Sequence, residues 1–215
     1  MMTTKMMRGA AEGAGTVLCC HLDPQDRVQA VGGAWDMAAR LNGGEGAFAE
    51  EVLGRPIWAF VSGDETRSYL NALFFWCRSR GGTFRTRYQY DTAALRRRCV
   101  MEISPLRSGL LKVESRLAGV GPPAPRDAPP VAPGGEIRRC SICLRAAAGE
   151  AWRPCGHPAP GGPPVRYVVC GACRADAADA LREADMRLAV LDAGGGAGGG
   201  AGRGDDRRAG GGAGG

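Results

Sequence analysis

The feature that most constrains this chain is a cluster of metal-ligand residues between positions 140 and 173. Two C-x2-C pairs frame the cluster and one C-x-H pair lies between them; the residues are Cys140, Cys143, Cys155, His157, Cys170 and Cys173. Each pair suits a tight turn that directs two ligands at one ion, and Zn²⁺ takes four such ligands in a tetrahedron. The spacing therefore predicts a structural zinc site, because unrelated cysteines seldom fall into two C-x2-C pairs.

The surroundings of the nine cysteines favour metal binding over disulfides. The first eight residues are polar and basic and no apolar segment follows them, so no secretory signal is expected. No stretch of ~18 apolar residues occurs, so no membrane span is expected either. We therefore expect an intracellular protein, nuclear or cytoplasmic, in a reducing compartment where clustered cysteines more often hold metal.

Composition divides the 215 residues into five segments. Six prolines between Pro122 and Pro133 predict a stiff, extended linker, and the glycine-rich C-terminus predicts disorder because it has nothing to bury. The expected segments are a weakly structured lead-in (1–22), an α+β globular domain (23–117), the proline-rich linker (118–136), a small treble-clef-like zinc module ending in a helix (137–192) and a disordered tail (193–215).

The first half of the globular domain carries helix signals and one strand signal. Asp23-Pro24 predicts a helix start, with an N-cap followed by proline. Glycines that follow apolar runs predict short helices over residues 35–41 and 47–53. The compact apolar run at residues 56–61 predicts a buried strand.

The second half of the domain reads as one long helix followed by strands. Residues 62–65 fit a capping box, and apolar residues then recur at helical spacing from Tyr69 to Cys77. Residues 83–90 alternate between apolar and polar side chains, which predicts a half-exposed strand. A further strand is expected at residues 99–103, while residues 110–117 fit a strand or a helix equally well.

Arginines and tyrosines are concentrated between positions 78 and 98. The residues are Arg78, Arg80, Arg85, Arg87, Arg96, Arg97, Arg98, Tyr88 and Tyr90. Such a face can hold phosphates through guanidinium groups and stack bases on aromatic rings. With a net charge of +6, this suggests nucleic-acid binding. The alternative is a solvated basic face in an arginine-rich chain, and no helix-turn-helix or RNP motif decides between them.

The ligand cluster resembles a RING finger, and its spacing is closest to the compact RING at the C-terminus of inhibitor-of-apoptosis proteins. The matching motif is Cys140-x2-Cys143-x11-Cys155-x-His157, followed by Cys170-x2-Cys173. RING fingers hold two zinc ions in a cross-brace and dock a ubiquitin-charged conjugating enzyme. The resemblance implies that the two C-x2-C pairs hold the first zinc, that Cys155 and His157 belong to a second, and that Ile142 contacts the conjugating enzyme.

Two departures from the RING pattern leave the zinc stoichiometry open. Twelve residues separate His157 from Cys170, where RING fingers usually have two or three, and no ligand pair follows Cys173. One zinc on the four cysteines is the simplest arrangement. In a second arrangement another zinc is completed from the lead-in residues Cys19, Cys20 and His21. In a third, Cys155 or His157 replaces a cysteine in the single site.

The sequence thus predicts a zinc-binding regulatory or interaction protein with a RING-like finger. The finer prediction is a RING-type ubiquitin transferase or its adaptor, with a conjugating enzyme and a protein target as partners. The alternative is a zinc-containing nucleic-acid-binding or transcription-associated protein. No catalytic residues are predicted, because no carboxylate pair, phosphate loop or nucleophile constellation occurs and a zinc with four protein ligands has no open position for water.

Overall fold

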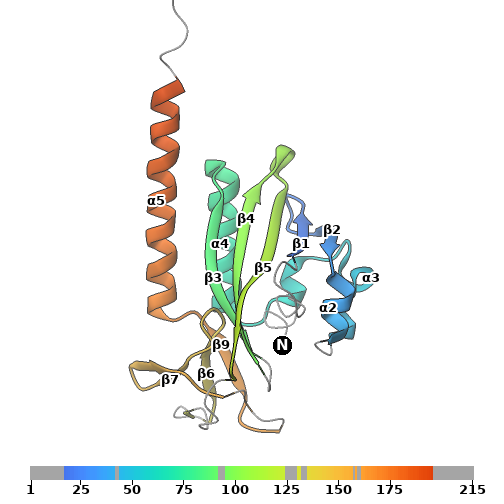
Figure 1. The fold of residues 1–215 in the computed structure, drawn as a ribbon, viewed down its shortest axis with the longest axis vertical. Helices are drawn as coiled ribbons and strands as arrows, with labels where there is room; N and C mark the ends of the chain where they lie inside the picture. Colours follow the sequence, from blue (N-terminus) through green and yellow to red (C-terminus); the bar gives the residue numbers. More distant parts are fainter. Residues whose placement is uncertain are drawn as a thin grey trace, which may run out of the picture.

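The computed structural model describes residues 17–41, 44–91, 95–123, 130–131, 135–156, 158 and 161–195. These residues form a mixed helix and sheet structure with two sheets, which confirms the α+β class (Figure 1). The N-terminal domain, β1 to β5, contains a five-stranded antiparallel sheet. The C-terminal module, β6 to α5, contains a small four-stranded sheet and a long helix.

The strands of the larger sheet lie in the order β2-β1-β5-β4-β3. Their bounds are β1 Val17–Leu22, β2 Val28–Gly33, β3 Phe84–Asp91, β4 Arg96–Pro105 and β5 Leu111–Gly121. β1 pairs with both β2 and β5, so the first and last strands of the domain are neighbours at the centre of the sheet. Side chains alternate between the two faces of each strand. Phe84, Met101 and Ile103 therefore share the inner face with other apolar residues, each at most 1% exposed.

Helices cover the inner face of this sheet. Between β2 and β3 the chain forms α2 Trp35–Leu41, η1 Glu45–Ala47, α3 Ala49–Val52, η2 Ile57–Phe60 and α4 Asp64–Arg80, and η3 Arg107–Gly109 joins β4 to β5. Phe60 and Leu73 reach the core from this layer and are 1% and 2% exposed. The opposite, outer face of the sheet carries mostly charged side chains.

α4 forms where helical spacing predicts it. Tyr69, Leu73 and Cys77 are among the residues on its buried face, and Gly81 ends it with a left-handed φ of 70°. Acidic residues in its first turn and basic residues in its last turn complement the helix dipole. The capping-box prediction is wrong, however, because the N-cap is Gly63 and no side chain caps the helix.

Three predictions for the first sixty residues are wrong. Residues 17–22 are strand β1 and not a weakly structured lead-in, because their backbone is paired on both sides; residues 1–16 lie outside the described part. Asp23-Pro24 begins a turn and not a helix, since β2 follows within a few residues. The run at 56–61 contains the 3₁₀ helix η2 and not a strand, and this single turn still buries Ile57 and Phe60.

Asp23 holds the turn between β1 and β2. Its Oδ1 accepts the backbone N–H groups of Gln25 at 2.9 Å and Arg27 at 2.8 Å, and its Oδ2 accepts the side-chain amide of Gln29 at 2.8 Å. The backbone N–H of Arg27 is the main cause that lowers the pKa of Asp23 below its ordinary value of 3.8. These bonds favour the ionised carboxylate in the folded state.

We therefore expect Asp23→Ala to lower the thermal midpoint at neutral pH. A folded-state pKa below 3.8 means that the carboxylate's contribution is complete above that value and is lost as the pH falls through the folded pKa. Asp23→Asn is the matched control, because its Oδ1 still accepts both backbone bonds but cannot titrate. Thermal melts from pH 2 to pH 7 should show a weaker acid dependence in both variants than in the wild type. An unchanged acid slope in Asp23→Asn contradicts the prediction.

The C-terminal module packs on the N-terminal domain and does not stand apart from it. Its strands are β6 Ile137–Cys140, β7 Ala146–Ala148, β8 Ala151–Arg153 and β9 Val165–Val168, in the order β8-β7-β6-β9, and its helix is α5 Gly171–Gly195. Ile142, Val169 and Ala177 belong to the same apolar core cluster as the residues under the larger sheet. The expectation that a proline linker separates the module is thus wrong for the described residues.

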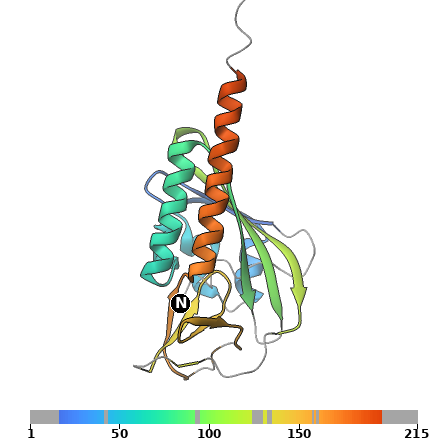
Figure 2. The same ribbon diagram turned by 90° about the vertical axis from the view of Figure 1, so that its left-hand side faces the viewer.

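α5 runs beside α4 from a common starting end. Arg174 pairs with Glu65 near the start of both helices at 2.9 Å, and Arg80 lies 3.8 Å from Asp185 near the end of α4. Figure 2 shows the two helices side by side, with α5 continuing past the end of α4. α5 includes residues 193–195 of the predicted tail, and residues 196–215 lie outside the described part. Among the described helices, none is long and apolar enough to cross a membrane.

Candidate metal centre

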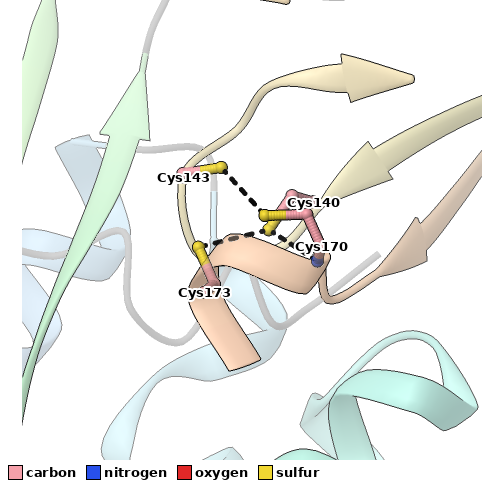
Figure 3. A group of neighbouring side chains, drawn as sticks. All are labelled: Cys140, Cys143, Cys170 and Cys173. Atoms are coloured by element: carbon pink, nitrogen blue, oxygen red, sulfur yellow. Dashed lines mark hydrogen bonds between the residues drawn. The ribbon is translucent and has the colours of Figure 1, made fainter. Parts of the chain in front are cut away.

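The two C-x2-C pairs meet at one point in the structure (Figure 3). Cys140 ends β6 and Cys143 lies in the turn that follows, while Cys170 immediately precedes α5 and Cys173 lies in its first turn. All four Sγ atoms lie within 4.8 Å of one another. Three of these cysteines are buried and Cys143 is partly exposed. The tertiary structure thus joins two knuckles that are separated by the whole β7–β9 segment.

The spacing of the sulfur atoms fits a metal ion and not disulfides. The Sγ atoms of Cys140 and Cys173 are 3.9 Å apart, and those of Cys143 and Cys170 are 3.7 Å apart. A disulfide requires about 2.05 Å between its sulfur atoms. Four thiolates placed tetrahedrally about 2.3 Å from Zn²⁺ lie about 3.8 Å from one another. The donor set therefore fits zinc in both ligand chemistry and size.

The electrostatics of the four thiols also favour a cation at their centre. Hydrogen bonds from the Cys143 and Cys173 side chains, with backbone N–H groups, lower the pKa of Cys140. The backbone N–H groups of Ile142 and Cys170 each lie 3.4 Å from this sulfur. The hydrogen bond to Cys140 raises the pKa of Cys143 to about 12, and the pKa of Cys173 is raised by the same sharing of protons. A divalent cation would replace these shared protons and allow all four thiolates to form.

Buried Arg139 supports the first knuckle. The backbone at Leu144 adopts a left-handed φ of 59°, which turns the chain back after Cys143. The Nε of Arg139 donates to the Leu144 carbonyl at 3.0 Å, although this arginine is only 2% exposed. In the sequence, only the position of Arg139 next to Cys140 indicates this role. Arg139 lies on the same side of β6 as Ile137.

Hydrogen bonds attach the knuckle to the N-terminal domain. The backbone N–H of Gln89, on β3, donates to the carbonyl of Ile142 at 2.7 Å. Thr66 of α4 donates its hydroxyl to Ser141 at 3.0 Å, and this threonine is fully buried. The candidate metal site is therefore part of the junction between β3, α4 and α5.

Gly63 lies where α4 meets β9, and we expect its replacement to disturb this junction. Its φ is 85°, and an added Cβ would lie 2.4 Å from the carbonyl oxygen of Tyr167. Gly63→Ala should cost about 3 kcal/mol or more, from backbone strain together with this overlap. Gly54→Ala is the matched control, because Gly54 also has a positive φ, 72°, but has no atom within 4 Å of the added Cβ.

Gly54→Ala should cost about 1–2 kcal/mol, the strain of a left-handed alanine alone. Urea unfolding of both variants measures the difference. Equal losses at the two positions would show that the approach of Tyr167 to Gly63 does not constrain the junction.

The other predicted ligands do not join the four cysteines. Cys155 is 3% exposed and donates its thiol to the Leu144 carbonyl at 3.8 Å. It packs in a small cluster with Ile137 and Ala146, and burial raises its pKa. His157 lies outside the described residues. The arrangement in which Cys155 enters the single site is therefore wrong.

The lead-in residues do not complete a second site among the described residues. Cys19, Cys20 and His21 lie in β1, between β2 and β5. Cys20 points into the core, where burial raises its pKa to about 12, while its neighbours are half-buried on the outer face of the sheet. Within the described ranges, only the four knuckle cysteines form a group that could hold a metal.

Ile142, predicted to contact a conjugating enzyme, is covered by the chain itself. Its side chain is 4% exposed and belongs to the main core cluster, while its carbonyl is bonded to β3. In this arrangement the side chain is almost fully covered, and it serves the packing of the module on the N-terminal domain.

The arginine and tyrosine residues are distributed over different surfaces. Tyr88 and Tyr90 are 3% and 2% exposed on the inner face of the sheet, where they cannot stack bases. Arg97 lies on the same inner face with its guanidinium carbon 5.2 Å from the ring centre of Tyr90. Arg85, Arg87 and Arg98 lie exposed on the outer face, Arg96 is half-buried beside Asp91, and Arg78 and Arg80 pair with Asp26 and Asp185.

Comparisons with known proteins add no functional assignment. No family model and no curated protein matches the chain. A solved domain of an HTR-like protein from Haloarcula marismortui matches at 20% identity with a TM-score of 0.34, covering 48% of this chain and 98% of that domain. A similarity this low shows neither the fold nor the function of this chain.

Proposed function

We propose that this chain is a zinc-binding regulatory or interaction protein in which one structural zinc fixes α5 and the small sheet to the N-terminal domain. The observation that carries this proposal is the meeting of four Sγ atoms from two distant knuckles. Cys140 and Cys143 bring the β6 turn to the site, and Cys170 and Cys173 bring the start of α5. One ion bound by all four would cross-link these segments.

The donor set supports a structural role for the metal. Thiolates are soft ligands that select zinc over magnesium or calcium, and four of them complete its coordination. A complete shell has no position for a substrate or an activated water. The contribution of the ion is therefore conformational, and the function of the protein follows from the surfaces that the ion holds in place.

The surface of α5 suits a polar partner protein. The helix has 25 residues, and its exposed side carries the pairs Asp179–Arg182 and Glu183–Arg187. Figure 1 shows the helix standing beside the sheet and extending beyond it. A helix fixed at its first turn by the metal and exposed further on can present such a surface in one orientation.

The two finer functional predictions gain no support from this geometry. A RING-type ubiquitin transferase would need an accessible Ile142, and this side chain is 4% exposed in the main core cluster. A nucleic-acid surface that stacks bases would need accessible rings, and Tyr88 and Tyr90 are buried. Both therefore remain predictions, to be tested by ubiquitin discharge and by salt-dependent nucleic-acid binding.

Zinc stoichiometry tests the proposed function. Elemental analysis of the purified full chain should give one zinc per chain, and Cys143→Ser should lose it. Cys155→Ser is the matched control and should retain it, because Cys155 lies in a separate cluster. Two zinc ions per chain, or loss of zinc in Cys155→Ser, would favour a RING-type second site, and a metal-free wild type would overturn the proposal.

A further inference from the structure

A cavity of about 420 Å³ lies between the larger sheet and the metal site. Its first wall comes from the strands and includes Arg87, Gln89 and Arg98. Its second wall comes from the C-terminal module and includes Cys143, Cys173 and Asp176. This volume lies within the range of small-molecule sites, roughly 300–1,000 Å³. The proposed structural zinc does not account for this cavity.

The arginines at this cavity differ from their neighbours on the same face. Arg85 pairs with Glu102, and Arg116 pairs with Glu114. Among the described residues, Arg87 and Arg98 form no ion pair with any carboxylate. Gln89 is paired directly with Arg98, and Arg87 is two residues away along β3. Both arginine side chains are exposed, so both can contact a ligand in the cavity.

A β-bulge shapes the first wall. The register of β4 and β5 shifts between Arg98 and Cys99, so Ala118 has no partner on β4 and lines the cavity. Arg98 lies opposite Gly119, and its Nη2 and Nε would be 3.5 Å and 3.6 Å from a Cβ added there. The side chain of Arg98 therefore lies along the bare backbone of Gly119 at the rim of the cavity.

The second wall has the opposite charge. Asp176 is exposed in the first two turns of α5, and no ion pair links it to another described residue. Four thiolates around a divalent cation also carry a formal charge of −2, and two of these sulfur ligands line the cavity. Basic groups from the strands and an acidic group from α5 therefore line the same cavity without forming an ion pair with each other. Such a polarised cavity suits a ligand that is itself dipolar.

We propose that this cavity binds a small zwitterion of the chemical class of free α-amino acids. The ligand carboxylate accepts hydrogen bonds from Arg87, Arg98 and the Gln89 side chain, since guanidinium groups match the planar geometry of a carboxylate. The ligand ammonium group lies toward Asp176 and the cysteine sulfurs. Binding would then link the sheet to the start of α5 across the cavity, which goes beyond the structural role of the metal.

Binding of the twenty L-amino acids to the zinc-loaded full chain tests this proposal. Thermal shift identifies a ligand and titration calorimetry measures its affinity. Propionate and n-propylamine, which each carry one of the two charges, should bind far more weakly than the best amino acid. Arg87→Gln, Arg98→Gln and Asp176→Asn should each weaken binding roughly tenfold to a hundredfold, the usual effect of losing one charged hydrogen bond.

Arg85→Gln is the matched control, because Arg85 lies on the same face of β3 but is paired with Glu102 and does not line the cavity. It should bind as the wild type does. The proposal is overturned if no amino acid binds, if propionate or inorganic phosphate binds as tightly, or if Arg85→Gln weakens binding equally. It is also overturned if Arg87→Gln and Arg98→Gln lose zinc without any ligand effect, since these arginines would then only neutralise the thiolates. Zinc content is measured separately, so failure here leaves the proposed function standing.

Discussion

Replacing Cys173 with serine is expected to release the metal and to destabilise the whole chain, not only the C-terminal module. Cys173 is one of the four candidate metal ligands, lies in the first turn of α5 and belongs to the core cluster that continues under the larger sheet. Loss of the metal removes the link between β6 and α5, and the residues packed behind them lose their fixed position. The expected loss is more than about 4 kcal/mol, as for other variants that lose a structural metal.

Urea unfolding followed by far-UV circular dichroism and by tryptophan fluorescence measures this effect. Both probes should shift together to lower urea, and a chelator should shift the wild type in the same direction. Cys19→Ser is the control, because Cys19 is half-buried on the outer face of β1, far along the chain from the site. Two separate transitions, with the second unchanged in Cys173→Ser, would mean that the module unfolds alone.

Replacing Ile142 with alanine is expected to cost about 2–5 kcal/mol while zinc stays bound. Ile142 lies between two candidate ligand cysteines but is 4% exposed, and it packs against the N-terminal domain. Truncation leaves a cavity at the junction. The surrounding backbone relaxes only in part, because the Gln89 N–H holds the Ile142 carbonyl in a hydrogen bond. This variant therefore separates docking of the module from metal binding, which Cys173→Ser cannot do.

Met186→Ala is the matched control for Ile142→Ala, because Met186 is a large apolar residue of the same module but 63% exposed. Its loss should be within about 0.5 kcal/mol. Elemental analysis should give the same zinc content for both variants. Equal stability of Ile142→Ala and wild type would show that the position of the knuckle does not depend on packing against the N-terminal domain. It would favour the sequence-based prediction that Ile142 contacts a partner protein.

Local patterns predicted several parts of this structure correctly. The apolar residues of α4 recur at helical spacing, and the alternation over residues 83–90 corresponds to β3. The same alternation places the tyrosines on one face and Arg85 and Arg87 on the other, so these residues do not share one face of the sheet. The order of the C-x2-C pairs identified all four residues of the candidate metal site.

Other parts depended on partners that are distant in sequence. β1 has few residues and weak alternation, and it is a strand because β5, nearly a hundred residues later, pairs with it. Ile57 and Phe60 are buried by a 3₁₀ turn as effectively as a strand would bury them, so apolar content alone could not choose between the two. No sequence signal marks Gln89 and Asp176 as neighbours of the metal site, because β3 and α5 meet only in the folded chain.

By itself, the sequence identified the four cysteines of the candidate centre, because paired cysteines that suit zinc are a matter of residue type and short spacing. The tertiary structure decided how that centre is used. It buried Ile142 in the main core cluster and placed the start of α5 beside α4, and it brought Arg87 and Arg98 to the same cavity as Cys143 and Asp176. These contacts join segments that are far apart in the chain. Apolar burial and backbone pairing set the positions of their side chains, and local spacing does not.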